Sequence, residues 1–239
     1  MRKTLTLAAC IALSSFACAG NAGVHKSPAI VAARFAECMK NADFDGILEL
    51  YAYHNDAIVK MIDPKAFALR LNALTPGNLP SGYYRITKIR MCANFSKQIN
   101  NMYYTMLLPD TFENLIHLNN PVILKDNPEI IDQYLKALDT EKLKKLELVR
   151  MDIALPDLQK SERHQNIVAR WKEVYQFDDK VEYTALYKLG DAYFEGGITF
   201  SKFGGKWYID SLTSSLANIE PLIKIENTGK YLSDCKLSK

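Results

Sequence analysis

The chain has 239 residues, of which 48% are hydrophobic and 24% are charged, a composition typical of ordinary globular proteins. Its 30 basic and 27 acidic side chains nearly cancel, and removal of the leader described below makes the balance 28 to 27. Nearly neutral, mixed charge gives no electrostatic reason to expect nucleic acid or an anionic membrane as the partner.

The first residues follow the plan of a secretory signal peptide. Arg2 and Lys3 form a positive start, a nearly uncharged apolar run follows, and small residues come next. We expect residues 1–22 to be a signal peptide cleaved after Ala19 or Ala22, which makes the protein periplasmic or secreted. The apolar run is shorter than the about 20 residues that cross a bilayer, and no later segment is suited to that role, so no transmembrane segment is expected.

The cysteines are consistent with export. Of five in the chain, Cys38, Cys92 and Cys235 follow the leader. An oxidising compartment permits one disulfide among them, with three pairings open, and we favour Cys92–Cys235 because it would tie down the C-terminal tail. Cys38 lies on the apolar side of an expected helix. A lipoprotein acylated on Cys18 of the leader is an alternative to free export, although the residues before it suit that role poorly.

The N-terminal part of the mature chain predicts helices. Ser27-Pro28 has the pattern of an N-cap followed by proline in the first helical position, with apolar residues at helical spacing after it. Asp43 predicts the cap of a second helix. The short apolar run 57–62 predicts a strand, and Asp63-Pro64 predicts the start of a third helix.

The middle of the chain predicts a mixture of strands and helices. The stretches YYRITKIRMCANF from Tyr83 and NNMYYTMLLP from Asn100 are rich in aromatic and β-branched residues, which predicts two strands. Asn127-Pro128 repeats the cap-plus-proline signal and predicts another helix. A strand is expected from about Leu146, and a helix over residues 161–176.

The C-terminal part predicts an antiparallel sheet. Residues 181–189 alternate between apolar and polar side chains, and the stretch GGITFSKFGGKWYIDSL follows. Gly204-Gly205 suits a two-residue type I′ turn, which pairs Phe203 with Lys206 and Phe200 with Ile209. A slip of one residue would mix the apolar and polar sides, so we expect this register and a sheet with one buried face.

SPAIVAARFAECMKNADFDGILELY at the head and GGITFSKFGGKWYIDSL near the end resemble the NTF2-like (SnoaL-like) cone fold over residues 27–53 and 181–213. The resemblance implies an α+β fold with N-terminal helices packed on a curved antiparallel sheet, elaborated by a helical middle segment. Residues 23–239 would then form a single domain. The fold serves enzymes, ligand-binding proteins and exported proteins of unknown role, and no catalytic motif of such families matches here.

An alternative is a duplicated α+β fold, with repeats over 24–120 and 121–213 and a tail over 214–239. IVKMIDP resembles LVRMDIALP, and YYRITKI resembles YTALYKL, in the same order along the chain. Few residues in these pairs are identical, so similarity between amphipathic elements explains them equally well.

Few residues suggest chemistry. His54, two residues before Asp56, could act as an acid–base group in a cavity, but a histidine at a helix end is the simpler interpretation. The spacing of histidine, cysteine and carboxylate residues predicts no metal site and no cofactor. Tyr183, Tyr187 and Trp207 could line a pocket on the concave side of the sheet, although filling the core beneath the helices is the simpler role.

These observations predict an exported, non-catalytic protein that binds a small ligand or a protein partner. The ligand-binding hypothesis rests on Tyr183, Tyr187, Trp207 and His54. Two alternatives stay open: an NTF2-like enzyme with a small pocket, using His54 or a buried carboxylate as base, and an accessory or dimerisation module of an envelope complex, such as a homodimer joined through a sheet edge.

Overall fold

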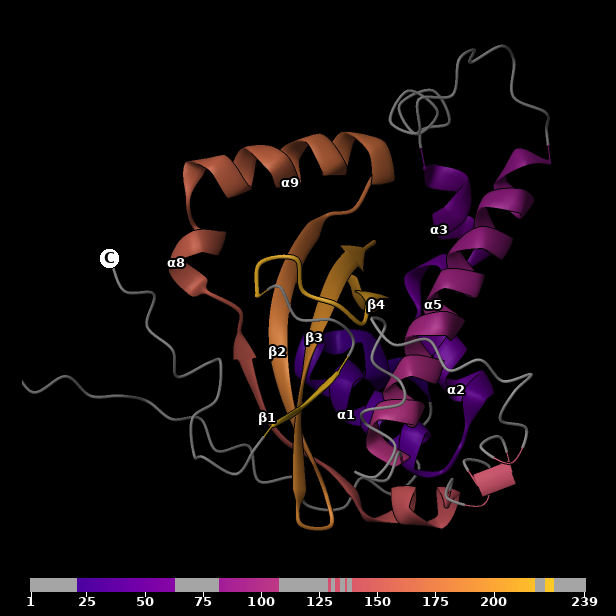
Figure 1. Ribbon diagram of the computed structural model, residues 1–239. Coiled ribbons are helices and arrows are strands. Elements are labelled where there is room, and N and C mark those ends of the chain that lie inside the picture. Colours follow the sequence, from indigo (N-terminus) through magenta and orange to yellow (C-terminus); the bar gives the residue numbers. More distant parts are fainter. Residues whose placement is uncertain are drawn as a thin grey trace, which may run out of the picture.

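The computed structural model describes residues 21–62, 82–107, 139–217 and 222–225, together with positions 129, 132, 133 and 136. Helices pack against an antiparallel sheet (Figure 1), which confirms the α+β class. The helices are α1 (Pro28–Lys40), α2 (Phe44–Leu50), α3 (Asp56–Met61), α5 (Tyr83–Leu107), α8 (Pro156–Gln159) and α9 (Glu162–Tyr175), with the 3-10 helices η1 (Asn21–Lys26), η2 (Ala52–His54) and η4 (Thr140–Lys145). The strands are β1 (Leu146–Ile153), β2 (Asp179–Leu189), β3 (Ala192–Phe203), β4 (Lys206–Ser211) and β5 (Ile223–Ile225).

The first two helices begin where their capping residues predicted. The Ser27 side chain accepts from Ile30 N at 3.4 Å, with Pro28 in the first turn of α1. Asp43 caps α2 by accepting from Gly46 N at 2.9 Å. These contacts satisfy backbone donors that a helix start otherwise leaves unpaired, which is why local sequence located both helices.

Three expected strands are helical instead, so those predictions were wrong. Residues 57–62 lie mainly in α3, which the Asn55 side chain caps by accepting from Ala57 N at 2.9 Å. The stretch from Tyr83, and the stretch from Asn100 as far as it is described, lie in the single long helix α5. Apart from Leu107 at its end, its buried residues recur every three or four positions: Thr87, Met91, Phe95, Ile99, Met102 and Met106. This helical period outweighs the aromatic and β-branched composition on which the strand prediction rested.

Several other predictions fall on residues outside the described ranges. These are residues 1–20 of the expected leader, the helix expected from Asp63, most of the helix expected after Pro128, and most of the C-terminal tail, including Cys235. Signal-peptide cleavage and the tail disulfide therefore stay predictions.

The sheet has the order β1-β2-β3-β4, with β5 pairing with β3, and all pairs are antiparallel. The predicted hairpin register is confirmed, because Phe203 pairs with Lys206 and Phe200 with Ile209. Both turn glycines have positive φ, +55° at Gly204 and +79° at Gly205, as the type I′ turn requires. The strand starting at Leu146 and the helix capped by Ser161 are confirmed as β1 and α9.

The prediction of one buried face was wrong, because both faces of β2 and β3 are covered. The apolar face carries Ala185, Tyr187, Ile198, Phe200 and Ile209, all at most 1% exposed. The polar face carries buried Glu182, Thr184, Thr199 and Ser201. The sequence pattern separates the two faces correctly but does not show that later segments cover the polar one.

One of those segments is the 213–217 loop that follows β4. The buried carboxylate of Glu182 accepts hydrogen bonds from Ser214 Oγ at 2.8 Å, Ser215 Oγ at 3.0 Å and Leu216 N at 3.0 Å. The loop passes over Gly197, where an added Cβ would lie 2.2 Å from Ser214 N. Glycine thus allows the close approach and Glu182 anchors the loop.

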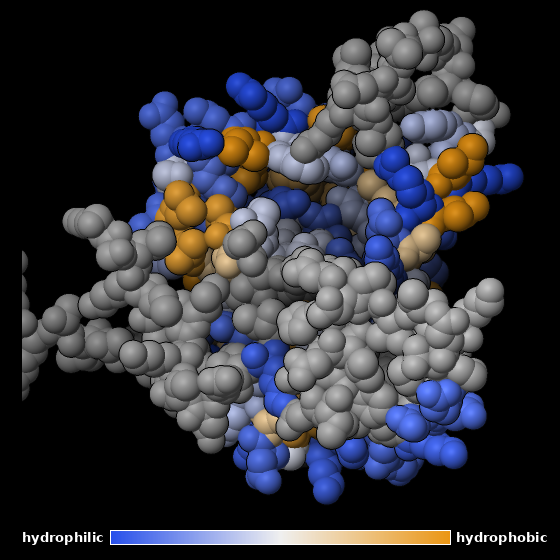
Figure 2. All heavy atoms as spheres, in the orientation of Figure 1, coloured by the Kyte–Doolittle hydropathy of each residue, from blue (hydrophilic) through white to orange (hydrophobic). Residues whose placement is uncertain are grey.

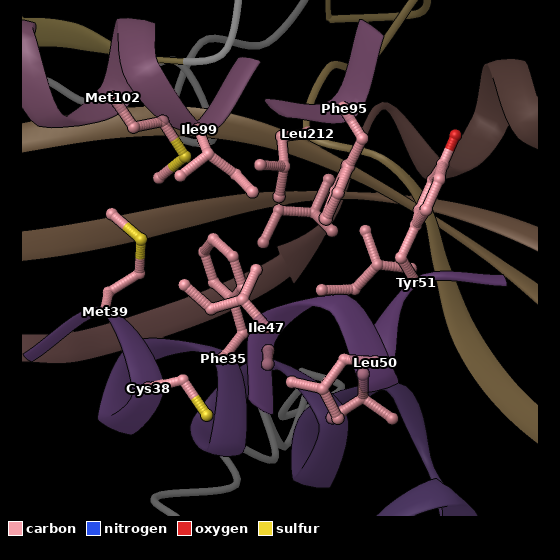
Figure 3. Close-up of a cluster of buried hydrophobic side chains, with 14 of the residues drawn as sticks. Phe35, Cys38, Met39, Ile47, Leu50, Tyr51, Phe95, Ile99, Met102 and Leu212 are labelled. Carbon is pink, nitrogen blue, oxygen red and sulfur yellow. The ribbon is translucent and has the colours of Figure 1, made fainter. Parts of the chain in front are cut away.

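The apolar face belongs to one core that also receives side chains from α1, α2 and α5. Figure 3 shows Phe35, Cys38 and Met39 of α1 and Ile47 and Leu50 of α2 on one side, with Phe95, Ile99 and Met102 of α5 opposite. The Tyr51 ring stacks on Phe95 with centroids 4.0 Å apart, and its hydroxyl donates to Met91 O at 3.2 Å. The α5 helix is thus joined to the segment that follows α2.

The segments behind the duplication hypothesis differ in structure. IVKMIDP begins in α3 whereas LVRMDIALP runs along β1, and YYRITKI begins α5 whereas YTALYKL lies in β2. Each pair joins a helix to a strand, so these two similarities have no structural counterpart, while the duplication as a whole stays a prediction.

Candidate functional site

A group of side chains from four elements meets where α9 crosses the end of the polar face. We call it the Lys180 cluster, and it consists of Tyr53 of η2, Trp171 and Tyr175 of α9, Lys180 of β2 and Asp210 of β4. Lys180 forms an ion pair with Asp210, and its ammonium lies 5.3 Å from the centre of the Trp171 ring. The rings of Trp171 and Tyr175 are stacked at 5.4 Å, and Tyr175 lies 6.0 Å from Tyr53.

The Asp210 carboxylate is the polar centre of the Lys180 cluster. It accepts from Ser201 Oγ at 3.2 Å in addition to its ion pair with Lys180, and it is hydrogen-bonded to the Tyr53 hydroxyl. The side chains of Lys180 and Asp210 are only 19% and 10% exposed. Burial, followed by the charge and the hydrogen bond of Asp210, raises the pKa of Tyr53 well above its ordinary value, so the phenol stays protonated and donates.

The α9 helix covers this cluster with apolar side chains that are only partly buried. Its inward stripe consists of Val168, Trp171, Val174 and Tyr175, all partly exposed, and no residue of α9 is fully buried. A helix packed closely on a sheet turns its apolar stripe towards the core and would bury more of it than α9 does. Figure 2 shows the reason: the surface is hollowed between α9 and α5, with hydrophilic residues deep inside.

The four residues predicted to bind a ligand do not meet in this hollow. Tyr187 is fully buried in the core, where its hydroxyl has no hydrogen-bond partner among the described residues. Tyr183 shares its face of the sheet and lies against Phe200, with ring centroids 5.8 Å apart. Trp207 is half-buried on β4, 5.7 Å from the ammonium of Lys202. Their common face is filled by the helices, which is the simpler role considered for them.

His54 ends η2 directly after Tyr53 and is partly exposed. Its backbone N–H bonds to Tyr51 O at 3.2 Å. Asp56, the acid considered as its partner, instead forms an ion pair with Lys88 of α5 at 2.7 Å. This arrangement is that of a histidine at a helix end.

Cys38 and Cys92, the cysteines among the described residues, form no disulfide with each other. Cys92 Sγ lies 3.8 Å from Tyr53 O as a weak donor, and Cys38 Sγ lies 3.6 Å from Asp43 Oδ2. Burial raises the pKa of Cys38 to about 12, which makes it an unreactive thiol at neutral pH. Since Cys235 lies outside the described residues, its pairing with Cys92 stays a prediction.

The described residues contain no group of three or more histidine, cysteine or carboxylate side chains placed to hold a metal ion. None of the helices within the same ranges combines the length and apolarity that crossing a membrane takes.

Sequence reasoning missed the Lys180 cluster. Trp171 and Tyr175 fall within the helix expected over residues 161–176, but Lys180, Asp210 and Tyr53 carried no motif. The sequence could have predicted one of these contacts, because the β3–β4 hairpin register places Asp210 close to Ser201. The position of Lys180 opposite Ser201 depends on the β2–β3 register, which the sequence did not predict. Tyr53 lies next to Asp210 because a parallel bridge pairs Tyr51 with Ile209. That bridge joins segments far apart in the chain.

Comparison with known proteins shows a relationship of fold. No protein-family model matches the chain, and no curated protein matches it. The structure is similar to a cystatin-like protein from Ruminococcus gnavus, with a TM-score of 0.52 and 16% sequence identity over 82% of this chain. The match covers 43% of that protein, so this chain spans less than half of its length. At this identity the likeness establishes a similar cone-like α+β fold and nothing about activity.

Proposed function

We propose that this protein is an exported binding protein that holds a small ligand in the hollow between α9 and α5. The observation that carries the proposal is the inward stripe of α9, whose apolar side chains stay partly exposed while the Trp171 ring lies over the Lys180 ammonium. Partly exposed aromatic rings above a few convergent polar groups are characteristic of small-molecule sites. Export is supported by the pattern of residues 1–22, and membership of the NTF2-like superfamily by the resemblance of the chain ends.

The Lys180 cluster defines the chemistry that such a ligand would meet. Trp171 and Tyr175 offer stacked rings for an apolar, planar group. Lys180 and Asp210 offer a donor and an acceptor, while their mutual ion pair keeps the site close to neutral. We therefore expect an uncharged or zwitterionic ligand with a flat apolar part and hydrogen-bonding groups at one end.

Binding is favoured over catalysis because of the state of Asp210. A general base needs a carboxylate that can accept a proton from substrate, whereas Asp210 is neutralised by Lys180 and also bonded by Ser201 and Tyr53. His54 has no acidic partner at Asp56. These contacts support a rigid recognition site rather than a proton-transfer site.

The two tryptophans allow a direct test. Trp207→Phe leaves Trp171 as the single tryptophan, and Trp171→Phe leaves Trp207. In a thermal-shift screen of small molecules, a true ligand should raise the melting temperature of the mature chain and change the fluorescence of the Trp207→Phe protein but not of the Trp171→Phe protein.

Controls separate site effects from stability effects. Trp171→Ala should weaken binding at least tenfold, whereas Phe44→Ala, which removes an aromatic side chain 54% exposed on α2, should leave it unchanged. A ligand that shifts the fluorescence of Trp207 alone would overturn the proposed site. Export is tested separately, by N-terminal sequencing of the mature protein from the cell exterior or periplasm.

A further inference from the structure

The two edges of the sheet differ. The outer edge of β4 is covered, because Trp207 O accepts from His25 Nδ1 of η1 at 2.7 Å and Ile209 forms a parallel bridge with Tyr51. At the other edge β1 pairs with β2 on one side, and no described strand lies beyond it (Figure 1). A strand edge with unpaired main-chain groups is a ready template for another strand.

The main chain of β1 shows which residues offer those groups. Ala154 N donates to Glu182 O of β2 at 2.9 Å, and the ladder pairs Asp152 with Thr184 and Arg150 with Leu186. Hydrogen-bonded positions alternate along an antiparallel strand, so Arg150, Asp152 and Ala154 bond inward to β2. The N–H and C=O groups of Met151 and Ile153 therefore point out of the sheet.

The side chains along this edge restrict what can bind there. Val149 and Ile153 are 49% and 47% exposed, and Leu158 of the adjoining α8 is 40% exposed. Figure 2 shows apolar side chains gathered over α8. Between the two apolar strand positions stand Arg150 and Asp152, joined by an ion pair at 2.6 Å. A β-bulge at Val149 ends the regular ladder on one side.

We propose that β1 pairs with β1 of a second copy of this chain, antiparallel about a two-fold axis through Met151. In that register Met151 faces its own copy in a hydrogen-bonded pair, Arg150 faces the partner copy's position 152, and Ile153 faces position 149. Arg150 and the opposing aspartate then occupy a non-hydrogen-bonded pair, where side chains approach most closely. Two-fold symmetry repeats each contact.

The charges select this register over its neighbours. Residues whose main-chain groups point out of the sheet must pair with residues of the same kind in the other copy. The nearest alternative registers that meet this condition have their two-fold axis through Arg150 or through Asp152. The first places two arginines opposite each other, and the second places two aspartates there, both of which destabilise a strand pair. A strand of another protein would pair well only if it placed an acidic residue opposite Arg150 and a basic residue opposite Asp152. A second copy of this chain meets both conditions, so it is the partner that this edge favours. The short regular ladder, from Arg150 to Ile153, predicts a weak dimer that forms with rising concentration.

The test is a charge swap. Sedimentation velocity on the mature chain should show a monomer–dimer equilibrium that shifts with concentration. Arg150→Asp and Asp152→Arg should each weaken dimerisation about tenfold or more, because each reversal places like charges opposite one another at two symmetric sites. The double reversal restores both pairs and should restore the dimer. Glu147→Arg, which makes the same charge change beyond the bulge, is the matched control and should dimerise normally.

Cross-linking tests the register itself. Met151→Cys places a thiol opposite its own copy within the range of Cα distances that a disulfide accepts, so mild oxidation should give a covalent dimer. Val149→Cys faces Ile153 of the other copy instead and should not link above the level of the unsubstituted chain. A wild-type chain that is monomeric up to its solubility limit would overturn the proposal and leave the edge for a strand of another protein. A folded double-reversal variant that stays monomeric would also overturn it, as would efficient linking through position 149 rather than 151.

Discussion

Gly197→Ala is predicted to be severely destabilising although it adds a single methyl group. The new Cβ would lie 2.2 Å from Ser214 N and 2.8 Å from Thr213 C, both of them backbone atoms, so no side-chain rotation relieves the overlap. The 213–217 loop must therefore move. That movement strains or breaks the three hydrogen bonds that the loop donates to buried Glu182.

The magnitude follows from these two contributions. Overpacking a close-packed site costs about 1–3 kcal/mol, and loosening hydrogen bonds to a buried charge costs about 1.5–3 kcal/mol each where water does not replace them. Water will replace some of them, so we expect a loss of about 3–5 kcal/mol in the free energy of unfolding, measured by urea denaturation.

Two controls make this prediction refutable. Gly82→Ala has open space around the new Cβ and should change the free energy of unfolding by less than about 1 kcal/mol. Glu182→Gln weakens the same loop anchor, so its effect should combine less than additively with that of Gly197→Ala. A Gly197→Ala protein as stable as the wild type, or strict additivity with Glu182→Gln, would refute the argument that the loop lies against Gly197.

Three further predictions concern single groups. Tyr187→Phe removes a buried hydroxyl that has no partner among the described residues, so it should leave the free energy of unfolding unchanged or raise it by about 1 kcal/mol. Tyr51→Phe loses the hydrogen bond to Met91 O and should lower that free energy by about 1 kcal/mol. Equal losses for the two variants in urea denaturation would contradict this prediction. Gly205→Ala should cost about 1–2 kcal/mol, because φ is +79° there although the space is open, and an unaltered unfolding midpoint would argue against the type I′ turn. Burial raises the pKa of Cys38 from 9.0 and of Tyr103 from 10.0 to about 12, so the folded state retains these protons at a pH where the unfolded state loses them. Stability should therefore be full below pH 9 and fall as the pH rises towards 12, and a urea midpoint that stays constant or rises from pH 8 to pH 11 would show that these groups are not buried.

The elements that sequence predicted correctly are those whose signal is local. Ser27 and Asp43 sit next to the backbone groups they cap, and Gly204-Gly205 supplies the positive φ angles of its own turn. The predictions failed for α5, where composition favoured strand while the three-to-four-residue recurrence of buried positions required helix. Composition is a weak prior that packing overrides, and the period is the stronger local signal.

The candidate site depended on contacts between segments distant in the chain. Tyr53 and Asp210 stand 157 positions apart by residue number, and Lys180 reaches Asp210 only across β3. Neither Lys180 nor Asp210 has a sequence neighbour that predicts its partner, so no motif could have indicated the ion pair between them. The same holds for the polar face of the sheet, which looks solvent-exposed in the alternation of β2 until Glu182 is seen to anchor the 213–217 loop.

The amino-acid sequence alone determined the capped N-terminal helices, the register of the β3–β4 hairpin and the separation of the sheet into an apolar and a polar face. Each depends on steric or hydrogen-bonding preferences within a few residues. Only the tertiary structure decided which face would be covered and that α9 would lie over Lys180 and Asp210. It also decided that, among the described strands, none pairs with the outer edge of β1, while η1 and the segment before η2 cover β4. These features depend on strand order and on long-range packing, which follow from the balance of burial over the whole chain rather than from any single segment.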